Sequence, residues 1–204
     1  MVVHVVQGAA YGFAAAVQPG PFQAYLISQT LRRGWRRSLP IVLAPLVSDG
    51  PIILLTLFAL SHVPPWWVQA LRFLGGLYIL YLAAGAWRSC RISGKRDLGA
   101  QSGGRSVFQA AFVNLLNPSA YLYWGLVTGP LLISGWRENP ANGVGFLVGF
   151  YVAVVASLAG ILLTFAYAGQ RGDKLNRWLQ GASGIALAGF GLYQLALGVW
   201  GWRP

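Results

Sequence analysis

The sequence predicts an all-α membrane protein whose six spanning helices form two inverted three-helix repeats, and three observations favour this fold class. First, 56% of the 204 residues are hydrophobic and only 9% are charged, whereas soluble domains carry about 25% charged residues. Second, the apolar residues form six runs near the roughly 20 residues that cross a bilayer, with basic residues in alternate connections. Third, a short sequence pattern recurs in the first and fourth runs.

The six expected spans leave little sequence between them, so residues 1–204 should form a single transmembrane domain. The spans cover residues 2–31, 39–62, 66–87, 107–135, 142–168 and 178–200. An alternative for the first span is a signal peptide cleaved near residues 14–16. Because residues 1–4 contain no Lys or Arg and the apolar run is longer than a cleavable one, we keep this span in the fold.

The basic residues behind the net charge of +11 gather in alternate connections between the expected spans. A nucleic-acid-binding protein would gather its basic residues in one patch, but twelve of the fifteen Lys and Arg residues follow the first, third and fifth spans. They are Arg32, Arg33, Arg36, Arg37, Arg88, Arg91, Lys95, Arg96, Arg105, Arg171, Lys174 and Arg177. The positive-inside rule therefore places these connections in the cytoplasm, near anionic lipid heads, and both termini outside. We expect no nucleic-acid partner.

Residues with the chemistry of a metal or catalytic site are scarce. The single Cys90 and the two histidines, His4 and His62, have no second ligand at metal spacing, so we expect no metal and no cofactor. An enzyme would need a nucleophile with a base, and the spans contain neither a Ser/His arrangement nor a His/Glu cluster. We therefore do not expect an enzyme.

The first span is interrupted near its centre by Gln18, Pro19, Gly20 and Pro21. Two prolines remove two amide donors and bias the residues before them away from helical torsions. In hydrocarbon such a break is tolerated only where it packs in protein or faces a watery cavity. We expect two half-helices here, with free carbonyls and exposed dipole ends.

The fourth span repeats this pattern in weaker form. Residues 13–20 read FAAAVQPG and residues 112–119 read FVNLLNPS; just beyond, AYL at 24–26 is matched by AYL at 120–122. Such short matches arise by chance in chains rich in Pro and Ala, but these occupy equivalent spans. They indicate an internal repeat of the kind that many transporters contain.

The repeat divides the chain into two halves. We expect repeat 1 at about 1–88, a basic cytoplasmic loop at about 88–106, and repeat 2 at about 107–204. Because each half has three spans, the second must be inverted relative to the first. The charges agree, since the first span ends in a basic loop and the fourth ends outside at residues 136–138.

The second span carries the only acidic residue inside any span, Asp49, between Pro45 and Pro51. We expect the two prolines to break this span as well. A charged carboxylate at the bilayer centre costs about 2.5 to 3.5 kcal/mol, so Asp49 should face a polar interior. It is a candidate for proton uptake and release or for binding a substrate ammonium group. The alternative is that Asp49 caps a half-helix beginning near Pro51.

Several of these features occur together along nearly the whole chain: Gly20-Pro21, the basic turn RRGWR at 32–36, Asp49, LRFLGGLY at 71–78, and NPSA at 117–120. Together they resemble the LysE/RhtB family of amino-acid exporters, small inner-membrane proteins of prokaryotes. The resemblance implies an exporter of amino acids or similar small solutes, linked to the proton-motive force. Two positions depart from the family, which leaves the substrate open: Phe22 stands where Asn is common, and Ser119 stands where Lys is often found.

Other polar residues of the spans are weighed in the same way. Asn114 and Asn117 lie on one helix face and could bind a zwitterion, or they could bond between helices. Tyr25 and Tyr121 could line a cavity or only pack. The expected substrate-binding residues are Gln18, Pro19, Gly20, Pro21, Gln23, Tyr25, Asn114, Asn117, Pro118, Ser119 and Tyr121.

Arg72 and the closely spaced glycines each allow two interpretations. Arg72 could clamp a substrate carboxylate or extend to the membrane interface. Three glycine pairs permit close helix contact, either within the chain or in a homodimer. These pairs are Gly8/Gly12, Gly125/Gly129 and Gly145/Gly149.

We therefore expect a proton-coupled secondary transporter that works by alternating access. One half would rock against the other while Asp49 takes a proton from outside and releases it inside, as the solute moves outward. The alternatives are a channel or exporter for a different small solute or ion, or a non-transporting scaffold.

Overall fold

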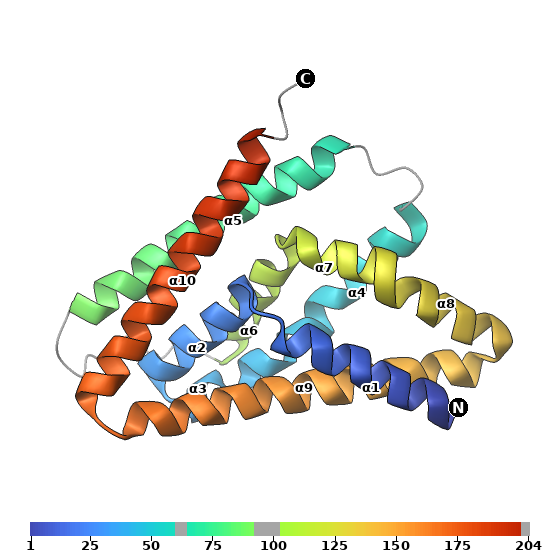
Figure 1. Ribbon diagram of the computed structural model, residues 1–204, viewed down its shortest axis with the longest axis horizontal. Coiled ribbons are helices and arrows are strands. Elements are labelled where there is room, and N and C mark those ends of the chain that lie inside the picture. Colours follow the sequence, from blue (N-terminus) through green and yellow to red (C-terminus); the bar gives the residue numbers. More distant parts are fainter. Residues whose placement is uncertain (60–64, 92–102, 201–204) are drawn as a thin grey trace.

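The computed structural model describes residues 1–59, 65–91 and 103–200, and this part of the chain is helical with short connections (Figure 1). The elements are α1 (Val2–Val17), α2 (Pro21–Arg33), α3 (Trp35–Ser38), the 3-10 helix η1 (Leu39–Leu43), α4 (Ala44–Ala59), α5 (Pro65–Arg91), α6 (Gly103–Leu115), α7 (Pro118–Tyr123), the π-helical turn η2 (Trp124–Thr128), α8 (Gly129–Glu138), α9 (Pro140–Gln170) and α10 (Asp173–Trp200). The expected all-α class is confirmed for the described residues. Most of the basic loop expected at 88–106, namely 92–102, lies outside them.

Within the residues that the structure describes, three segments are long and apolar enough to cross a membrane by length and composition. They are Trp35–Thr56, Pro140–Gln170 and Trp178–Trp200. Shorter apolar helices occur at Val2–Val17, Arg72–Ala84 and Ser106–Leu115. The chain thus has several candidate spans, while the arrangement of six spans in two inverted halves stays a prediction.

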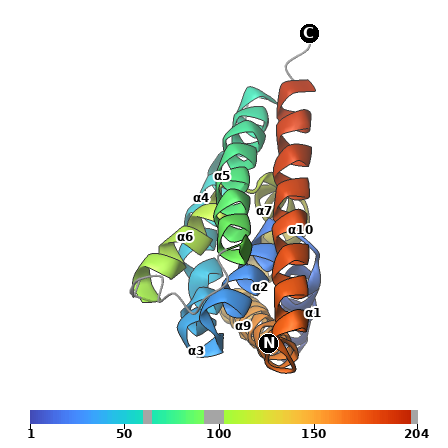
Figure 2. The ribbon, with the colours of Figure 1, turned by 90° about the vertical axis from the view of Figure 1, so that its left-hand side faces the viewer.

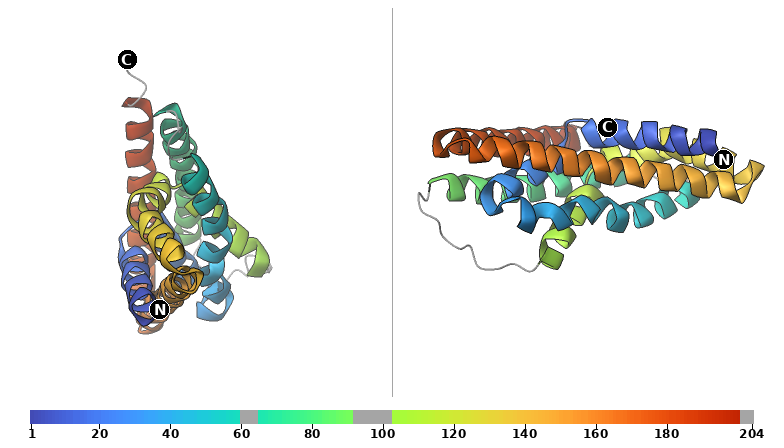
Figure 3. Two further views of the ribbon diagram at one scale, coloured as in Figure 1. Left: turned by 90° about the vertical axis from the view of Figure 1, so that its right-hand side faces the viewer. Right: turned by 90° about the horizontal axis from the view of Figure 1, so that it is seen from below.

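Two helix pairs dominate the packing. α1 lies along α9, the long helix that follows the longest axis of the molecule (Figure 1 and Figure 3). α5 lies along α10, and the two stand side by side when the molecule is seen from its end (Figure 2). α2 contacts both α9 and α10 and so joins the two pairs. The broken-up series α6, α7, η2 and α8 packs against α4 on the remaining side.

The contact between α1 and α9 depends on glycine. A Cβ added at Gly8 would overlap the carbonyl oxygen of Phe146, and one at Gly12 would overlap that of Phe150. From the other helix, a Cβ at Gly149 would overlap the carbonyl oxygen of Val5. Small residues of this kind let backbones approach closely inside membranes. The pairs Gly8/Gly12 and Gly145/Gly149 therefore serve a contact within the chain.

The second span differs from the expectation that Pro45 and Pro51 break it. α4 continues without interruption from Ala44 to Ala59 and contains Pro51 in its interior. Pro45 falls in the first turn, where the missing amide has no helical partner to lose, and interior prolines are tolerated in packed membrane helices. The irregular part comes earlier, as η1. Asp49 consequently lies inside a helix and does not cap a half-helix beginning at Pro51.

Candidate functional site

The first junction, residues 18–20, separates α1 from α2. Gln18 and Gly20 have extended backbones, with φ/ψ of −61°/121° and −166°/177°. α2 then begins at Pro21, whose fixed φ suits a first helical position. The side-chain amide of Gln23 reaches back and donates to the carbonyl oxygens of Ala16 at 3.0 Å and Ala15 at 3.4 Å. One residue therefore supplies partners for two carbonyls that the end of α1 leaves free.

The second junction, residues 116–117, separates α6 from α7. Asn117 is extended, with φ −91° and ψ 108°, and α7 begins at Pro118. The Oδ1 atom of Asn117 accepts a hydrogen bond from the backbone amide of Ser119 at 3.2 Å. The hydroxyl of Tyr121 donates to the carbonyl oxygen of Leu115 at 2.8 Å. The side chain of Asn117 thus bonds a free amide at the start of α7, and the side chain of Tyr121 bonds a free carbonyl at the end of α6.

Asp49 lies on α4 beside the second junction and is buried, with only 5% of its surface exposed. The Nδ2 atom of Asn114 donates to Asp49 Oδ1 at 2.9 Å and to the Ser48 hydroxyl at 2.8 Å. The side chains of Trp124 and Tyr151 are also within hydrogen-bonding reach of the carboxylate. All of these partners are neutral, so the carboxylate is solvated by dipoles rather than by a cation.

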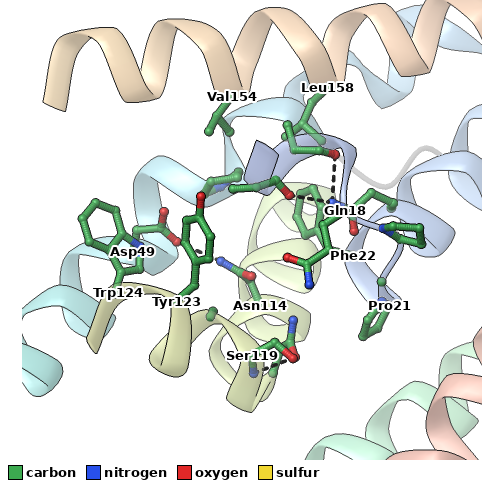
Figure 4. A pocket seen from close by; sticks show the side chains of 18 of the residues that line it. Gln18, Pro21, Phe22, Asp49, Asn114, Ser119, Tyr123, Trp124, Val154 and Leu158 are labelled. Atoms are coloured by element: carbon green, nitrogen blue, oxygen red, sulfur yellow. Dashed lines mark hydrogen bonds between the residues drawn. The ribbon is translucent and has the colours of Figure 1, made fainter. Parts of the chain in front are cut away.

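A cavity of about 290 Å³ lies between the two junctions and reaches Asp49 (Figure 4). Its volume is near the lower end of the roughly 300 to 1,000 Å³ typical of small-molecule pockets. Its wall contains Ala15, Ala16, Gln18, Pro19, Gly20, Pro21, Phe22, Gln23, Pro45, Asp49, Asn114, Asn117, Ser119, Ala120, Tyr123, Trp124, Phe150, Val154, Leu158, Phe190, Tyr193 and Gln194.

Most of the residues expected at the site meet around this cavity. Both carboxamide-proline elements, Gln23, Asn114 and Asp49 contribute to its wall. Three expected residues do not: Tyr25 and Pro118 are buried elsewhere, and Tyr121 is half-buried with its hydroxyl bonded to the backbone. Arg72, half-buried on α5, is not in the wall either. Of the two interpretations for Asn114, the structure shows the bond between helices.

The apolar side of the cavity was not predicted from the sequence. It is formed by residues of α2, α9 and α10 such as Phe22, Val154, Leu158 and Phe190. In an apolar span such residues look the same whether they face lipid, another helix or a cavity. Gln194 of α10, which is 7% exposed, is the exception. Because a polar side chain within a span is costly unless it faces the interior of the protein, this carboxamide was a signal in the sequence that α10 contributes to the cavity.

Two tyrosines connect the parts of the chain on either side of the cavity. The hydroxyl of Tyr25 on α2 donates to Gln109 Oε1 on α6 at 3.1 Å. The hydroxyl of Tyr123 on α7 donates to the carbonyl oxygen of Tyr11 on α1 at 2.7 Å. In each case the tyrosine follows one junction, and its acceptor lies in the helix that precedes the other junction.

The chain is similar to known proteins over most of its length. The family model described as LysE type translocator matches residues 13–198. The threonine efflux protein of Salmonella typhi is 27% identical over 94% of this chain and 93% of its own. The threonine efflux protein of Escherichia coli (strain K12) is 26% identical with the same coverage. No solved structure gives a significant match. Since the family model covers most of the sequence, the chain belongs to the LysE type translocator family.

Proposed function

We propose that this chain exports amino acids or related small solutes through the cavity between the junctions, coupled to the proton gradient by alternating access. The observation that carries the proposal is the presence of a buried carboxylate, Asp49, in the wall of a solute-sized cavity. Ionisable groups inside membrane proteins mark ion or substrate pathways. Relatives named threonine efflux proteins support an amino-acid solute.

The packing supports two inverted halves. An inverted repeat pairs the first span with the fourth, the second with the fifth and the third with the sixth. The contacts of α1 and α2 with α9 then correspond to the contacts of α6 and η2 with α4, and the pair α5 and α10 is its own counterpart. In Figure 1, the chain from α1 to α2 runs opposite to the chain from α6 to α8.

The two tyrosine bonds fit the same symmetry. Tyr25 and Tyr123 differ by 98 in residue number, and so do their acceptors, Tyr11 and Gln109. The junctions give nearly the same difference, since Pro21 and Pro118 both begin half-helices. We take these bonds as gates on opposite sides of the cavity. In an alternating-access cycle, breaking the Tyr25 bond opens the path on one side of the cavity, and breaking the Tyr123 bond opens it on the other.

The orientation follows from charge. Three elements carry Arg32, Arg36 and Arg171: the end of α2, α3, and the turn between α9 and α10. These elements lie on the left of Figure 1. The N-terminus and the turn between α8 and α9 lie toward the other end. By the positive-inside rule the basic end faces the cytoplasm and both termini face outside. The protein then sits in the inner membrane with the Tyr25 gate on the cytoplasmic side.

Asp49 is the proposed coupling group. The ionised carboxylate accepts a bond from Asn114, as in the structure, and can hold a solute ammonium group. Protonation from outside removes the charge, which releases the solute there, and the return of the empty carrier carries the proton inward. One proton moving in is thereby exchanged for one solute moving out.

Export from vesicles or cells loaded with an amino-acid panel tests the proposal, comparing the native chain with Asp49→Asn at matched amounts. We expect Asp49→Asn to abolish gradient-driven export, because the site can no longer bind and release a proton. Glu138→Gln, at an exposed carboxylate of α8, is the control and should export normally. Export by the native chain that continues unchanged after the gradient is collapsed would instead indicate a channel. No export of any panel member would refute the amino-acid assignment.

A further inference from the structure

A further sequence pattern recurs in α5 and α10, the two helices that lie side by side. It reads GLYILYL at 76–82 and GLYQLAL at 191–197. A Cβ added at Gly76 would lie 2.8 Å from Cγ of Leu195. A Cβ added at Gly191 would lie 2.8 Å from Cγ of Leu80. Leu80 and Leu195 hold the same place in the pattern, so each of these contacts is the image of the other.

The tyrosines of this pattern, Tyr78 and Tyr193, differ in their surroundings. Tyr78 packs edge-on against Phe112 of α6, with ring centroids 4.9 Å apart and an angle of 87° between the rings. Phe112 holds the same place before the second junction as Phe13 holds before the first. The image of the contact is therefore Tyr193 with Phe13. Within the part of the chain that the structure describes, neither of these rings packs on another aromatic ring, and Tyr193 is 62% exposed.

The neighbouring residues show the same difference. Gly75, just before the pattern in α5, fits closely against the second junction, because a Cβ there would overlap the carbonyl oxygen of Leu116. Phe190 and Val17 hold the corresponding places in α10 and α1. Phe190 lines the cavity, as does Tyr193, and Val17 is 44% exposed. α5 therefore closes on the second junction, while the cavity separates α10 from the first.

Resting on the proposed function, we propose that Phe13 and Tyr193 form the outer aromatic gate of the cavity, which is open in this structure. In the opposite state of the transport cycle the two rings pack together, and the contact of Phe112 with Tyr78 opens in exchange. The inverted repeat supplies the reason, since the same contacts exchanged between the halves give the opposite state. Phe13 lies on α1, which begins at the outer end, so its gate is the outer one.

The pair of α5 and α10 is the unit that moves. Close approach of their backbones holds the two helices together, since a Cβ added at Gly198 would also lie 3.0 Å from the backbone nitrogen of Phe73. Beyond the first junction, α1 runs toward the right of Figure 1, while the second half of α10 rises toward the top. The hydroxyl bonds of Tyr25 and Tyr123 are both made, so the two sides of the cavity differ in the contacts of α5 and α10.

Cross-linking in membranes tests the gate without a transported solute. In a chain whose single Cys90 is replaced by Ala, Phe13→Cys and Tyr193→Cys should be joined by a short bis-methanethiosulfonate reagent. Adding Phe112→Ala removes an aromatic contact that favours the present state, so cross-linking should become about two- to tenfold faster. Phe108→Ala is the matched control, because Phe108 lies one turn earlier on α6 and is 70% exposed. It should leave the rate unchanged.

A second measurement uses the cross-link as a lock. Joining positions 13 and 193 should stop export of the amino-acid panel, because a closed outer gate cannot release a solute, and a thiol reductant should restore export. Tyr78→Cys with Phe112→Cys shows that the reagent works, since these positions are in contact in the structure. This second pair should react in the same membranes.

The outcomes separate the gate from the proposed function. The gate would be overturned if the second pair reacted and positions 13 and 193 did not, or if Phe112→Ala and Phe108→Ala changed the rate equally. Export that continued unchanged through the locked protein would overturn it too. Each of these results leaves the exporter intact. Cross-linking as expected in a protein that releases no panel member would refute the exporter and leave the gate.

Discussion

The two junctions solve the same problem in different ways. At both, a helix ends in the middle of the molecule and another begins at a proline, Pro21 or Pro118. At the second junction, the Asn117 side chain caps the new helix and a tyrosine one turn later completes the old one. At the first junction, Gly20 provides no side-chain cap, and the carbonyls of Ala15 and Ala16 accept from the side chain of Gln23.

The second junction therefore forms a fixed wall of the cavity, and the first junction forms an open wall, whose backbone amides can bind a solute. At the second junction the carbonyl oxygen of Leu115 and the amide of Ser119 already have partners, so this junction forms a surface against which a solute packs. The amides that open α2 have no side-chain partner, so they can bind a solute directly. Pseudo-symmetric positions have therefore acquired different roles. Four substitutions test this comparison, in order of decreasing expected effect on stability.

Gln23→Leu should have the largest effect. Leucine fills a similar volume but leaves the carbonyl oxygens of Ala15 and Ala16 without a partner, and each unsatisfied acceptor costs about 1 to 3 kcal/mol. We expect a loss of about 2 kcal/mol in the free energy of unfolding in detergent, and export should fall as the junction shifts. Gln7→Leu, at an exposed position of α1, is the control. A change of the same size in both variants would show that Gln23 does not hold the junction.

Tyr121→Phe should have about half that effect. The change removes one hydroxyl and leaves one carbonyl, that of Leu115, without its bond. We expect a loss of about 1 kcal/mol in the free energy of unfolding, measured in the same way. Tyr81→Phe serves as the control, because Tyr81 is 72% exposed. If Tyr121→Phe destabilised the protein more than Gln23→Leu, the second junction would be the more dependent of the two.

The contrast between the junctions also shows how much of the structure could be predicted from the sequence. Prolines, carboxamides and alternating basic connections predicted the all-α class and most of the polar cavity wall, because each acts locally. The continuation of α4 through Pro51 was not predictable, since packing rather than local torsion decides whether a helix tolerates proline. Nor was the role of Tyr25, whose partner Gln109 is 84 positions away. The apolar wall depends on which faces of α9 and α10 turn inward, and that is fixed only by the assembled fold.

Asn117→Ala tests the cap of the second junction. Loss of an Asn cap costs about 1 kcal/mol. Asn139→Ala is a close match, because Asn139 also precedes a proline and its side chain accepts from the amide of Ala141 at 2.9 Å. Both variants should therefore lose similar stability in a thermal melt. Only Asn117→Ala should also change export, since Asn139 lies outside the cavity wall; equal export in both would remove Asn117 from the site.

Gly20→Ser should have the smallest effect on stability and the most informative effect on function. A serine in this position can cap α2, which gains only a few tenths of a kcal/mol over glycine. Its Cβ would lie 3.2 Å from Oε1 of the Gln23 side chain, so this oxygen must shift by a few tenths of an ångström. The new hydroxyl can bond to the amides at the start of α2, which are otherwise open to the solute, so we expect a slightly more stable protein that exports more slowly. Gly20→Ala adds the same Cβ without the hydroxyl, and the difference in export rate between Ser and Ala isolates the cap. Equal rates in the two variants would mean that the open start of α2 is not where the solute binds, and the comparison of a fixed wall with an open one would fail.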